Sequence, residues 1–208
     1  VSQNREEVKR HLNVQYLASA VQVHDDHVTV VEDITHDREY KGTDALISGQ
    51  KGVGLLIQQA DCQAVLLHDP QRKVIGAVHS GWKGSVVNII AKTVRAMQEH
   101  FSTSPEDLRA VISPSLGPCC AEFVHYKKEL PGPFHRWQMA ANYFDFWEIS
   151  RWQLREAGLC NDHIEAIGIC TMCNQDFFSY RRASNTADLQ RKPGVTGRNG
   201  SVITLSCK

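Results

Sequence analysis

The sequence predicts a single α+β domain over residues 1–208, with a mixed β-sheet covered by helices. Short apolar runs that are typical of strands outnumber the segments with helical spacing. The two kinds of segment also do not alternate one for one, as they would in a doubly wound α/β fold. A chain of 208 residues, 42% of them hydrophobic, is long enough for one domain with a proper core and marginal for two.

The predicted strands are short apolar or alternating runs, bounded by turn residues. In chain order they cover 20–23, 27–32, 43–48, 54–58, 64–68, 74–79, 108–112, 164–170 and 201–205. Asp69 and Pro70 form a turn between two of them, as Asp-Pro pairs favour.

The predicted helices have apolar residues at helical spacing. In the helix predicted over 86–100 these are Val86, Ile89, Ile90, Val94 and Met97. A second helix is predicted over 137–158, with Gly158 as its C-cap, and a short one begins at Pro105. Residues 80–85, 113–120 and 183–197 are predicted to be loops.

Composition excludes some classes of function. Lys plus Arg and Asp plus Glu both number 23, so a generic nucleic-acid or anionic-membrane surface is not expected. No apolar run approaches the roughly 20 residues that span a bilayer, and the polar start is unlike a signal peptide. Seven cysteines without a secreted-type framework indicate a reduced, cytoplasmic chain. The chain begins with Val, which fits removal of an N-terminal piece.

His24, Cys62 and His79 are the candidate metal ligands. Each lies at the end of a predicted strand, where a rigid sheet can hold an exposed side chain in place. Two imidazoles and one thiolate suit zinc and leave a fourth position open, and copper accepts the same ligands. Ten histidines and seven cysteines also produce accidental triples, so spacing alone does not decide. Alternatively, Cys62 is a nucleophile and His79 its base.

Other features are weaker. Cys170 and Cys173 form a CxxC pair that could be redox-active, or half of a structural zinc site with Cys119 and Cys120. We expect reduced, packed cysteines instead. The glycine-containing loop 80–85 precedes a helix and could bind an anion at the helix N-terminus. A late basic group could bind phosphate, or simply form a solvated face; it consists of Arg181, Arg182 and Arg198.

Eight short motifs occur in a characteristic order. They are Gln22-Val-His24, Thr43-Asp-Ala-Leu, Ala60-Asp-Cys62, His79-Ser-Gly-Trp-Lys-Gly84, Gly117-Pro-Cys-Cys120, Cys170-Thr171, Phe177-Phe-Ser-Tyr-Arg-Arg182 and Thr196-Gly-Arg198. Together they resemble the YfiH or laccase-domain family, also described as multicopper polyphenol oxidases or peptidoglycan editing factors. The resemblance covers essentially the whole chain and implies an α+β sandwich once described as cysteine-hydrolase-like.

The resemblance implies that His24, Cys62 and His79 bind zinc, with copper as the alternative. It also implies purine nucleoside phosphorylase activity on adenosine, inosine, guanosine and methylthioadenosine, with adenosine deaminase activity. On this basis Cys62, His79 and Asp61 are the expected catalytic residues, with Asp61 or Asp44 moving a proton. The residues expected to bind substrate or phosphate are Gln22, Asp44, Lys83, Arg181, Arg182 and Arg198.

Several positions depart from the family's pattern. A Gly-rich segment usually precedes the Asn-Arg that is here Asn4-Arg5, and we expect this chain to lack it. Ser80, Lys83 and Ala121 stand where Ala, Arg and Tyr are usual, Gln63-Ala64 replaces a usual x-Pro, and an insertion spans 187–195. The alternatives to a phosphorylase are a copper-dependent polyphenol oxidase, a cysteine hydrolase or cell-wall editing enzyme using Cys62, and a non-enzymatic binding protein. The oligomeric state is left open.

Overall fold

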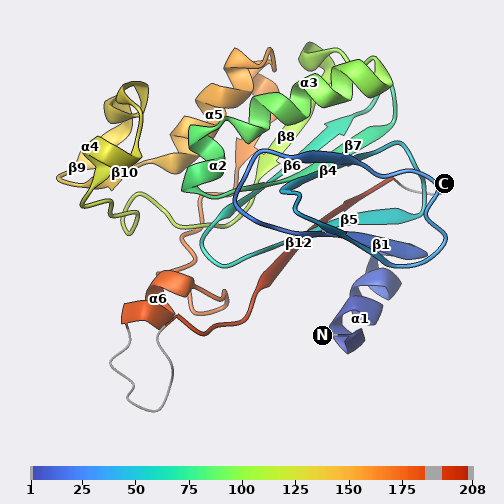
Figure 1. The fold of residues 1–208 in the computed structure, drawn as a ribbon, viewed down its shortest axis with the longest axis horizontal. Coiled ribbons are helices and arrows are strands. Elements are labelled where there is room, and N and C mark those ends of the chain that lie inside the picture. Colours follow the sequence, from blue (N-terminus) through green and yellow to red (C-terminus); the bar gives the residue numbers. More distant parts are fainter. Residues whose placement is uncertain (1, 186–193, 206–208) are drawn as a thin grey trace.

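The computed structural model describes residues 2–185 and 194–205, and it is built from two packed β-sheets with helices over one of them (Figure 1). This confirms the predicted α+β class with mixed sheets. No helix among the described residues is long and apolar enough to cross a membrane.

The larger sheet has six strands in the order β11-β8-β6-β7-β4-β2. Its central strands β6, β7 and β4 pair antiparallel, whereas β2 runs parallel to β4 and β11 parallel to β8. The strands are β2 Val28–Val30, β4 Ala45–Ser48, β6 Gln63–Asp69, β7 Val74–Ser80, β8 Arg109–Ile112 and β11 Ile164–Ala166.

The smaller sheet has four strands in the order β12-β5-β1-β3, in which β1 runs parallel to both of its neighbours. Apolar side chains of β1 and β5 meet those of β4 and β7 between the sheets, and this contact buries one hydrophobic core. The four strands are β1 Tyr16–Val21, β3 Arg38–Lys41, β5 Val53–Gln59 and β12 Asn199–Thr204.

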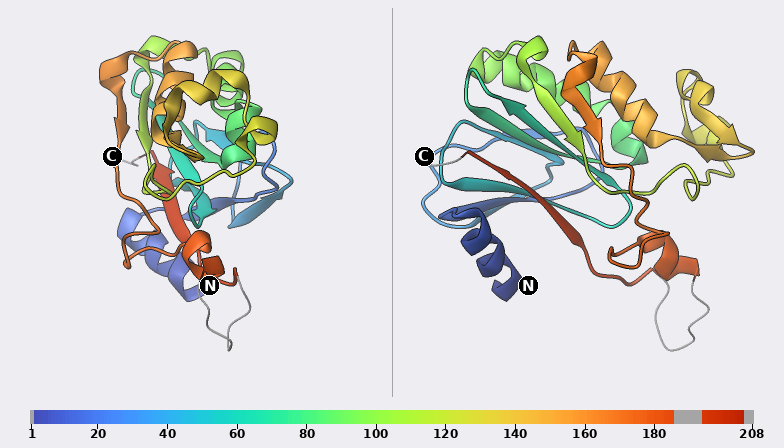
Figure 2. Two further views of the ribbon diagram at one scale, coloured as in Figure 1. Left: turned by 90° about the vertical axis from the view of Figure 1, so that its left-hand side faces the viewer. Right: turned by 180° about the vertical axis from the view of Figure 1, so that it is seen from behind.

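Helices α3 and α5 cover the other face of the larger sheet (Figure 2). The helix predicted over 86–100 is divided, because Val86 ends α2 and is exposed, whereas Ile89, Ile90, Val94 and Met97 of the predicted stripe are buried in α3 (Ile89–Phe101). The Asn88 side chain caps α3 by accepting a hydrogen bond from the Ala91 N–H. Asp145 caps α5 (Phe146–Glu156) in the same way. The other helices are α1 Ser2–Leu12, α2 Trp82–Val86, α4 Tyr126–Glu129, α6 Tyr180–Asn185 and the 3-10 turns Pro105–Asp107, Gly132–Trp137 and Asn161–His163.

Some sequence predictions were wrong. The helix predicted over 137–158 begins only at Phe146, because Asn142 adopts a left-handed turn (φ 67°) between the short strands β9 (Gln138–Ala140) and β10 (Tyr143–Phe144). The loop predicted over 80–85 contains most of α2, which begins at Trp82 directly after the N-cap residue Gly81. Most of the insertion at 187–195 lies outside the described residues.

Candidate metal centre and its cavity

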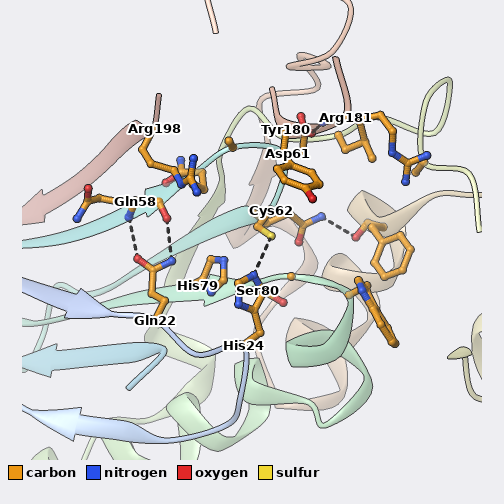
Figure 3. Close-up of a pocket in the computed structure, with 18 of the residues that line it drawn as sticks. Gln22, His24, Gln58, Asp61, Cys62, His79, Ser80, Tyr180, Arg181 and Arg198 are labelled. Carbon is orange, nitrogen blue, oxygen red and sulfur yellow. Dashed lines mark hydrogen bonds between the residues drawn. The ribbon is translucent and has the colours of Figure 1, made fainter. Parts of the chain in front are cut away.

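The pairing of strands brings His24, Cys62 and His79 together. His24 follows β1 and Cys62 follows β5, and these parallel neighbours end at the same edge of the smaller sheet. Cys62 immediately precedes β6, whose Ala64 pairs with His79 at the end of β7. Three residues far apart in sequence therefore meet where the two sheets adjoin (Figure 3). We call His24, Cys62 and His79 the triad.

The ligand atoms of the triad all lie within 4.8 Å of one another. The Cys62 Sγ is 3.9 Å from the His24 Nε2, and the two imidazole rings stand edge to face at a centroid distance of 4.8 Å. Gly81 closes one side of the triad, because a Cβ there would lie 2.9 Å from the Cys62 Sγ. Only glycine leaves the sulfur and the His24 ring in place at this contact.

Asp44 forms hydrogen bonds with two parts of the triad, the backbone around His24 and the ring of His79. Its carboxylate accepts hydrogen bonds from the backbone N–H groups of Val23, His24 and Asp25, at 3.0, 2.9 and 3.1 Å. It also accepts one from the His79 Nδ1 at 2.7 Å. This bond leaves the Nε2 of His79 for a metal, as carboxylate–histidine pairs do in metal sites. Asp44 is fully buried and does not line the cavity, so its placement favours an orienting role over the predicted proton-transfer or substrate-binding role.

The electrostatics of the triad favour a thiolate. Burial opposes ionisation of Cys62, but hydrogen bonds with His24 and His79 outweigh it and lower the pKa of the thiol from its ordinary 9.0 to about 6. Burial likewise opposes the charge on His79, yet its hydrogen bonds to Asp44 and Cys62 raise its pKa from 6.5 to about 9. At neutral pH the metal-free pair is a thiolate beside an imidazolium.

The backbone is unusual at two of these positions. His24 has φ 63° and Asp61 has φ 84°, both in the left-handed region that non-glycine residues rarely adopt. Asp61 is held there because its carboxylate accepts a hydrogen bond from the Thr171 Oγ1 at 2.7 Å and another from the Arg181 N–H at 2.6 Å. Strained residues of this kind cluster at functional sites. Both carboxylate oxygens of Asp61 are thus engaged, one with the loop after β11 and one with the start of α6, although the residue lines the cavity as well.

A cavity of about 800 Å³ lies over the triad. Its aromatic wall is built around Phe123, whose ring packs against Trp82 and Phe146 at centroid distances of 6.3 and 5.1 Å. Tyr180 and Arg198 lie on the same side of Cys62 and His79, above them in Figure 3. Small-molecule sites in proteins have volumes of about 300–1,000 Å³, mostly apolar walls and a few polar groups, and this cavity fits that description.

Only some of the predicted substrate-binding residues line the cavity. Gln22, Arg181 and Arg198 line the cavity, but the Gln22 amide is already paired with the backbone of Gln58 through two hydrogen bonds of 2.7 and 3.0 Å. Lys83 is exposed, lies over the Trp82 ring and does not line the cavity. Arg182 does not line it either.

Arg182 has a different position from its neighbour Arg181. Its guanidinium donates hydrogen bonds to the backbone carbonyls of Thr171 and Met172, at 2.8 and 2.9 Å, and also to those of Asn174 and Phe177. This placement favours a role in holding the loop after β11 rather than the predicted contact with phosphate. No pattern in the sequence separates the two arginines, because they are adjacent in one motif.

Sequence reasoning missed the aromatic wall, and it named a second cluster of potential ligands only as an alternative that we did not expect. Phe123 and Phe146 carry no local pattern, because they meet only in the folded chain. Cys119, Cys120, Cys170 and Cys173 lie together, and we call them the tetracysteine cluster. The expectation that these cysteines are packed was wrong for Cys119 and Cys173, which are exposed, whereas Cys120 and Cys170 are half-buried.

The donor set of the triad fits a metal ion. Two imidazole nitrogens and a thiolate sulfur face a common point beside the cavity, and a zinc ion bound by three protein ligands keeps a position open for a substrate or water. Copper is compatible with the same donors. The triad can therefore serve as a catalytic metal site that opens into the cavity.

The similarity to known proteins extends over the whole fold. A purine nucleoside phosphorylase of Bacteroides thetaiotaomicron is 34% identical over 151 residues, which are 68% of this chain and 56% of that protein. The chain thus spans little more than half of that relative's length. Purine nucleoside phosphorylase YlmD of Bacillus subtilis is 31% identical over 99% of this chain and 77% of its own.

A solved structure gives the same result. The crystal structure of the hypothetical protein YfiH of Bacillus licheniformis superposes with a TM-score of 0.85, at 30% identity, over 98% of this chain and 80% of that one. The model of one protein family, described as multi-copper polyphenol oxidoreductase laccase, matches residues 1–206. On its sequence, its fold and the placement of its motifs, the chain belongs to this laccase-domain family.

Proposed function

We propose that the chain is a zinc-dependent purine nucleoside phosphorylase acting on adenosine, inosine, guanosine and methylthioadenosine, with adenosine deamination as a second reaction. The observation that carries the proposal is the composition of one cavity, which joins the triad, an aromatic wall and the guanidinium of Arg198. A purine nucleoside and phosphate need an apolar flat surface, a polar centre and a cation. The names of the Bacteroides and Bacillus subtilis relatives support the same reaction.

His24, Cys62 and His79 would hold the zinc ion, and Asp44 keeps the His79 ring oriented through its Nδ1. A zinc ion in this position supplies a Lewis acid that polarises a substrate oxygen and neutralises developing charge. The thiolate of Cys62, which is already ionised at neutral pH, would reduce the net charge of the bound ion.

The chain's own side chains position the substrates. Arg198 is exposed at the rim, and its Nη1 donates hydrogen bonds to the carbonyls of Thr196 and Gly197, both at 3.0 Å. These bonds fix the guanidinium while its remaining N–H groups can bind phosphate oxygens, as arginine does in bidentate pairs. The ring of Phe123 offers a flat apolar surface for the purine, and the cavity wall excludes water from the face of the purine that packs against it.

In the reaction an oxygen of hydrogen phosphate forms a bond to the anomeric carbon of ribose. The bond from that carbon to the purine nitrogen breaks, and its electron pair leaves with the base. The proton of hydrogen phosphate ends on the base, so the products are ribose 1-phosphate and the free purine. Holding both reactants in one cavity lowers the entropic part of the barrier.

The direct test is incubation of the zinc-loaded protein with adenosine, with and without phosphate, followed by separation of the products. Adenine and ribose 1-phosphate that form only with phosphate are the expected result, and inosine formed without phosphate reports deamination. Absence of turnover on all four nucleosides, in protein whose triad is shown to hold zinc, contradicts the proposal.

Arg198→Met tests the phosphate contact, with Lys83→Met as its matched control because Lys83 is also basic and exposed but lies outside the cavity. Loss of a charge-assisted pair costs about 1.5–3 kcal/mol, so the KM for phosphate should rise by about 10- to 100-fold in Arg198→Met. The same rise in both variants would remove Arg198 from the phosphate site.

A second candidate function rests on the thiolate–imidazolium pair of Cys62 and His79. Such a pair is also the reactive form of a cysteine nucleophile with its base, as in a cysteine hydrolase or cell-wall editing enzyme. Alkylation of Cys62 stops both kinds of enzyme. A chelator separates them, because it stops only the metal-dependent one and leaves a thiol hydrolase active.

Copper chemistry is the third possibility, and it follows from the family's description. Among the described residues, the groups of three or more potential ligands are the triad and the tetracysteine cluster, so histidine clusters for several further coppers are not found in that part of the chain. Oxygen uptake with a phenol, measured on copper-loaded and zinc-loaded protein, tests this alternative. Uptake with copper alone would support it.

A further inference from the structure

The tetracysteine cluster lies outside the cavity, on two loops that the fold brings together. Strands β8 and β11 are parallel neighbours, so their carboxyl ends lie at the same edge of the larger sheet. Cys119 and Cys120 follow β8, and Cys170 and Cys173 follow β11. A bridge between Ser115 and Cys170 continues the parallel pairing beyond the strands.

The spacing of the four sulfurs matches a single tetrahedral ion. All four lie within 4.8 Å of one another, and Cys173 Sγ is 3.7 Å from Cys119 Sγ and 3.4 Å from Cys120 Sγ. With Zn–S bonds of about 2.3 Å, the edge of a regular tetrahedron of sulfurs is about 3.8 Å. A disulfide would place two sulfurs about 2.0 Å apart, and the 3.4 Å between the Cys120 Sγ and the Cys173 Sγ is far longer.

The surroundings of the cluster also suit a thiolate–metal site. The Gly117 N–H donates a hydrogen bond of 3.3 Å to the Cys170 Sγ, the kind of outer contact that orients a ligating sulfur. Gly117 is needed for this approach, because a Cβ there would lie 3.0 Å from the Cys170 Cβ and 2.9 Å from the Trp147 ring. Four sulfur ligands at tetrahedral spacing favour zinc, and they fill all the positions of the ion.

We propose that Cys119, Cys120, Cys170 and Cys173 bind a second, structural zinc ion that ties the loop after β8 to the loop after β11. The loop after β8 forms part of the cavity, and the loop after β11 reaches the triad through Asp61. Ala121 and Glu122 line the cavity next to Cys120, and Thr171, beside Cys170, donates the hydrogen bond that anchors Asp61 next to Cys62. The ion thus holds a wall of the cavity in place without contacting its contents.

Metal analysis of the whole protein, purified with reductant and supplied with zinc, tests the proposal without any measurement of turnover. Cys120→Ser and Cys173→Ser should each lose one zinc ion per chain relative to wild type. Cys160→Ser is the matched control, because Cys160 is an exposed free cysteine outside the cluster, and it should lose none. Cys62→Ser should lose the ion of the triad and keep the second one, so the fates of the two sites are separable.

Cobalt substitution gives a second readout that does not depend on counting ions. Co²⁺ in Cys62→Ser protein should show strong sulfur-to-cobalt charge-transfer absorption and the visible bands of tetrahedral coordination, and Cys173→Ser should remove the four-sulfur spectrum. Hydrogen exchange in the loops 113–125 and 167–179 should speed up in Cys173→Ser but not in Cys160→Ser.

Two results would overturn the proposal. One is equal zinc content in wild type, Cys120→Ser and Cys173→Ser. The other is a Cys120–Cys173 disulfide in the reductant-purified, zinc-supplied protein, identified by mass spectrometry. If a variant fails to fold, the cobalt spectrum of Cys62→Ser decides alone, and a spectrum without four-sulfur coordination rejects the site.

Discussion

The triad and the tetracysteine cluster are both assembled at the ends of paired parallel strands, but their surroundings differ. Each lies at the carboxyl ends of neighbouring parallel strands, β1 with β5 and β8 with β11. Each also needs a glycine at close range, Gly81 in one case and Gly117 in the other. The triad has three potential ligands, with a buried carboxylate on one side and a cavity on the other, whereas the cluster has four sulfurs on surface loops.

The carboxyl ends of parallel strands can thus position side chains for chemistry in one sheet and for stability in the other. An ion with three protein ligands keeps a position for a substrate, and an ion with four does not. Burying the Asp44 carboxylate, which orients one imidazole, has a desolvation cost. A purely structural site has no need of such a buried charge. The comparison therefore predicts that activity depends steeply on the triad and only indirectly on the cluster.

The largest expected effect comes from Cys62→Ala. The variant should lose metal at the triad together with phosphorolysis. Lewis-acid stabilisation is worth several kcal/mol and a factor of ten in rate is about 1.4 kcal/mol, so kcat/KM should fall by about a thousandfold or more. Kinetics with adenosine and phosphate measure the loss, and Cys160→Ala is the control. Full activity in Cys62→Ala would remove the triad from the chemistry.

How much of the triad could be predicted from sequence depends on which contacts are local. His24, Cys62 and His79 were each predicted at the end of a strand, and the ordered motifs around them pointed to one site. The role of Asp44 was out of reach, because it follows from the long-range pairing of Ala45 on β4 with Val78 on β7. That register alone places the carboxylate beside His79.

The cluster shows the same limit more clearly. Cys120 and Cys173 are separated by 53 positions, and their proximity depends on the parallel pairing of β8 with β11. Secondary structure was missed for a related reason. Strand β3 is a polar edge strand (Arg38–Lys41), and α1 buries none of its residues, so neither has the apolar periodicity that sequence reasoning uses.

Asp44→Asn is expected to have a smaller effect than Cys62→Ala. The amide is nearly isosteric and can still accept a hydrogen bond, but it removes the charge that orients His79. Loss of such an outer carboxylate typically weakens metal binding by about 10- to 100-fold. Competition with a chelator measures zinc affinity at the triad, and the cobalt spectrum of the cluster should not change. Equal weakening at both sites would mean that Asp44 acts on the fold as a whole.

The smallest expected effect is the dependence of zinc affinity on pH, and it distinguishes His79 from Cys62 within the triad. The pKa of His79 is raised to about 9, so at pH 7 a proton occupies the imidazole and must leave its Nε2 before zinc can bind. Cys62, with its pKa lowered to about 6, is already a thiolate and releases almost none.

The affinity of the triad should therefore rise about tenfold per pH unit from 7 to 8 and level off above about 9. Chelator competition on Cys173→Ser protein isolates the triad for this measurement. Calorimetry in buffers with different ionisation enthalpies should give about one proton released per zinc at pH 7. A rise of about a hundredfold per unit would mean that Cys62 also binds its proton there, and a flat profile would mean that His79 is neutral before the metal binds.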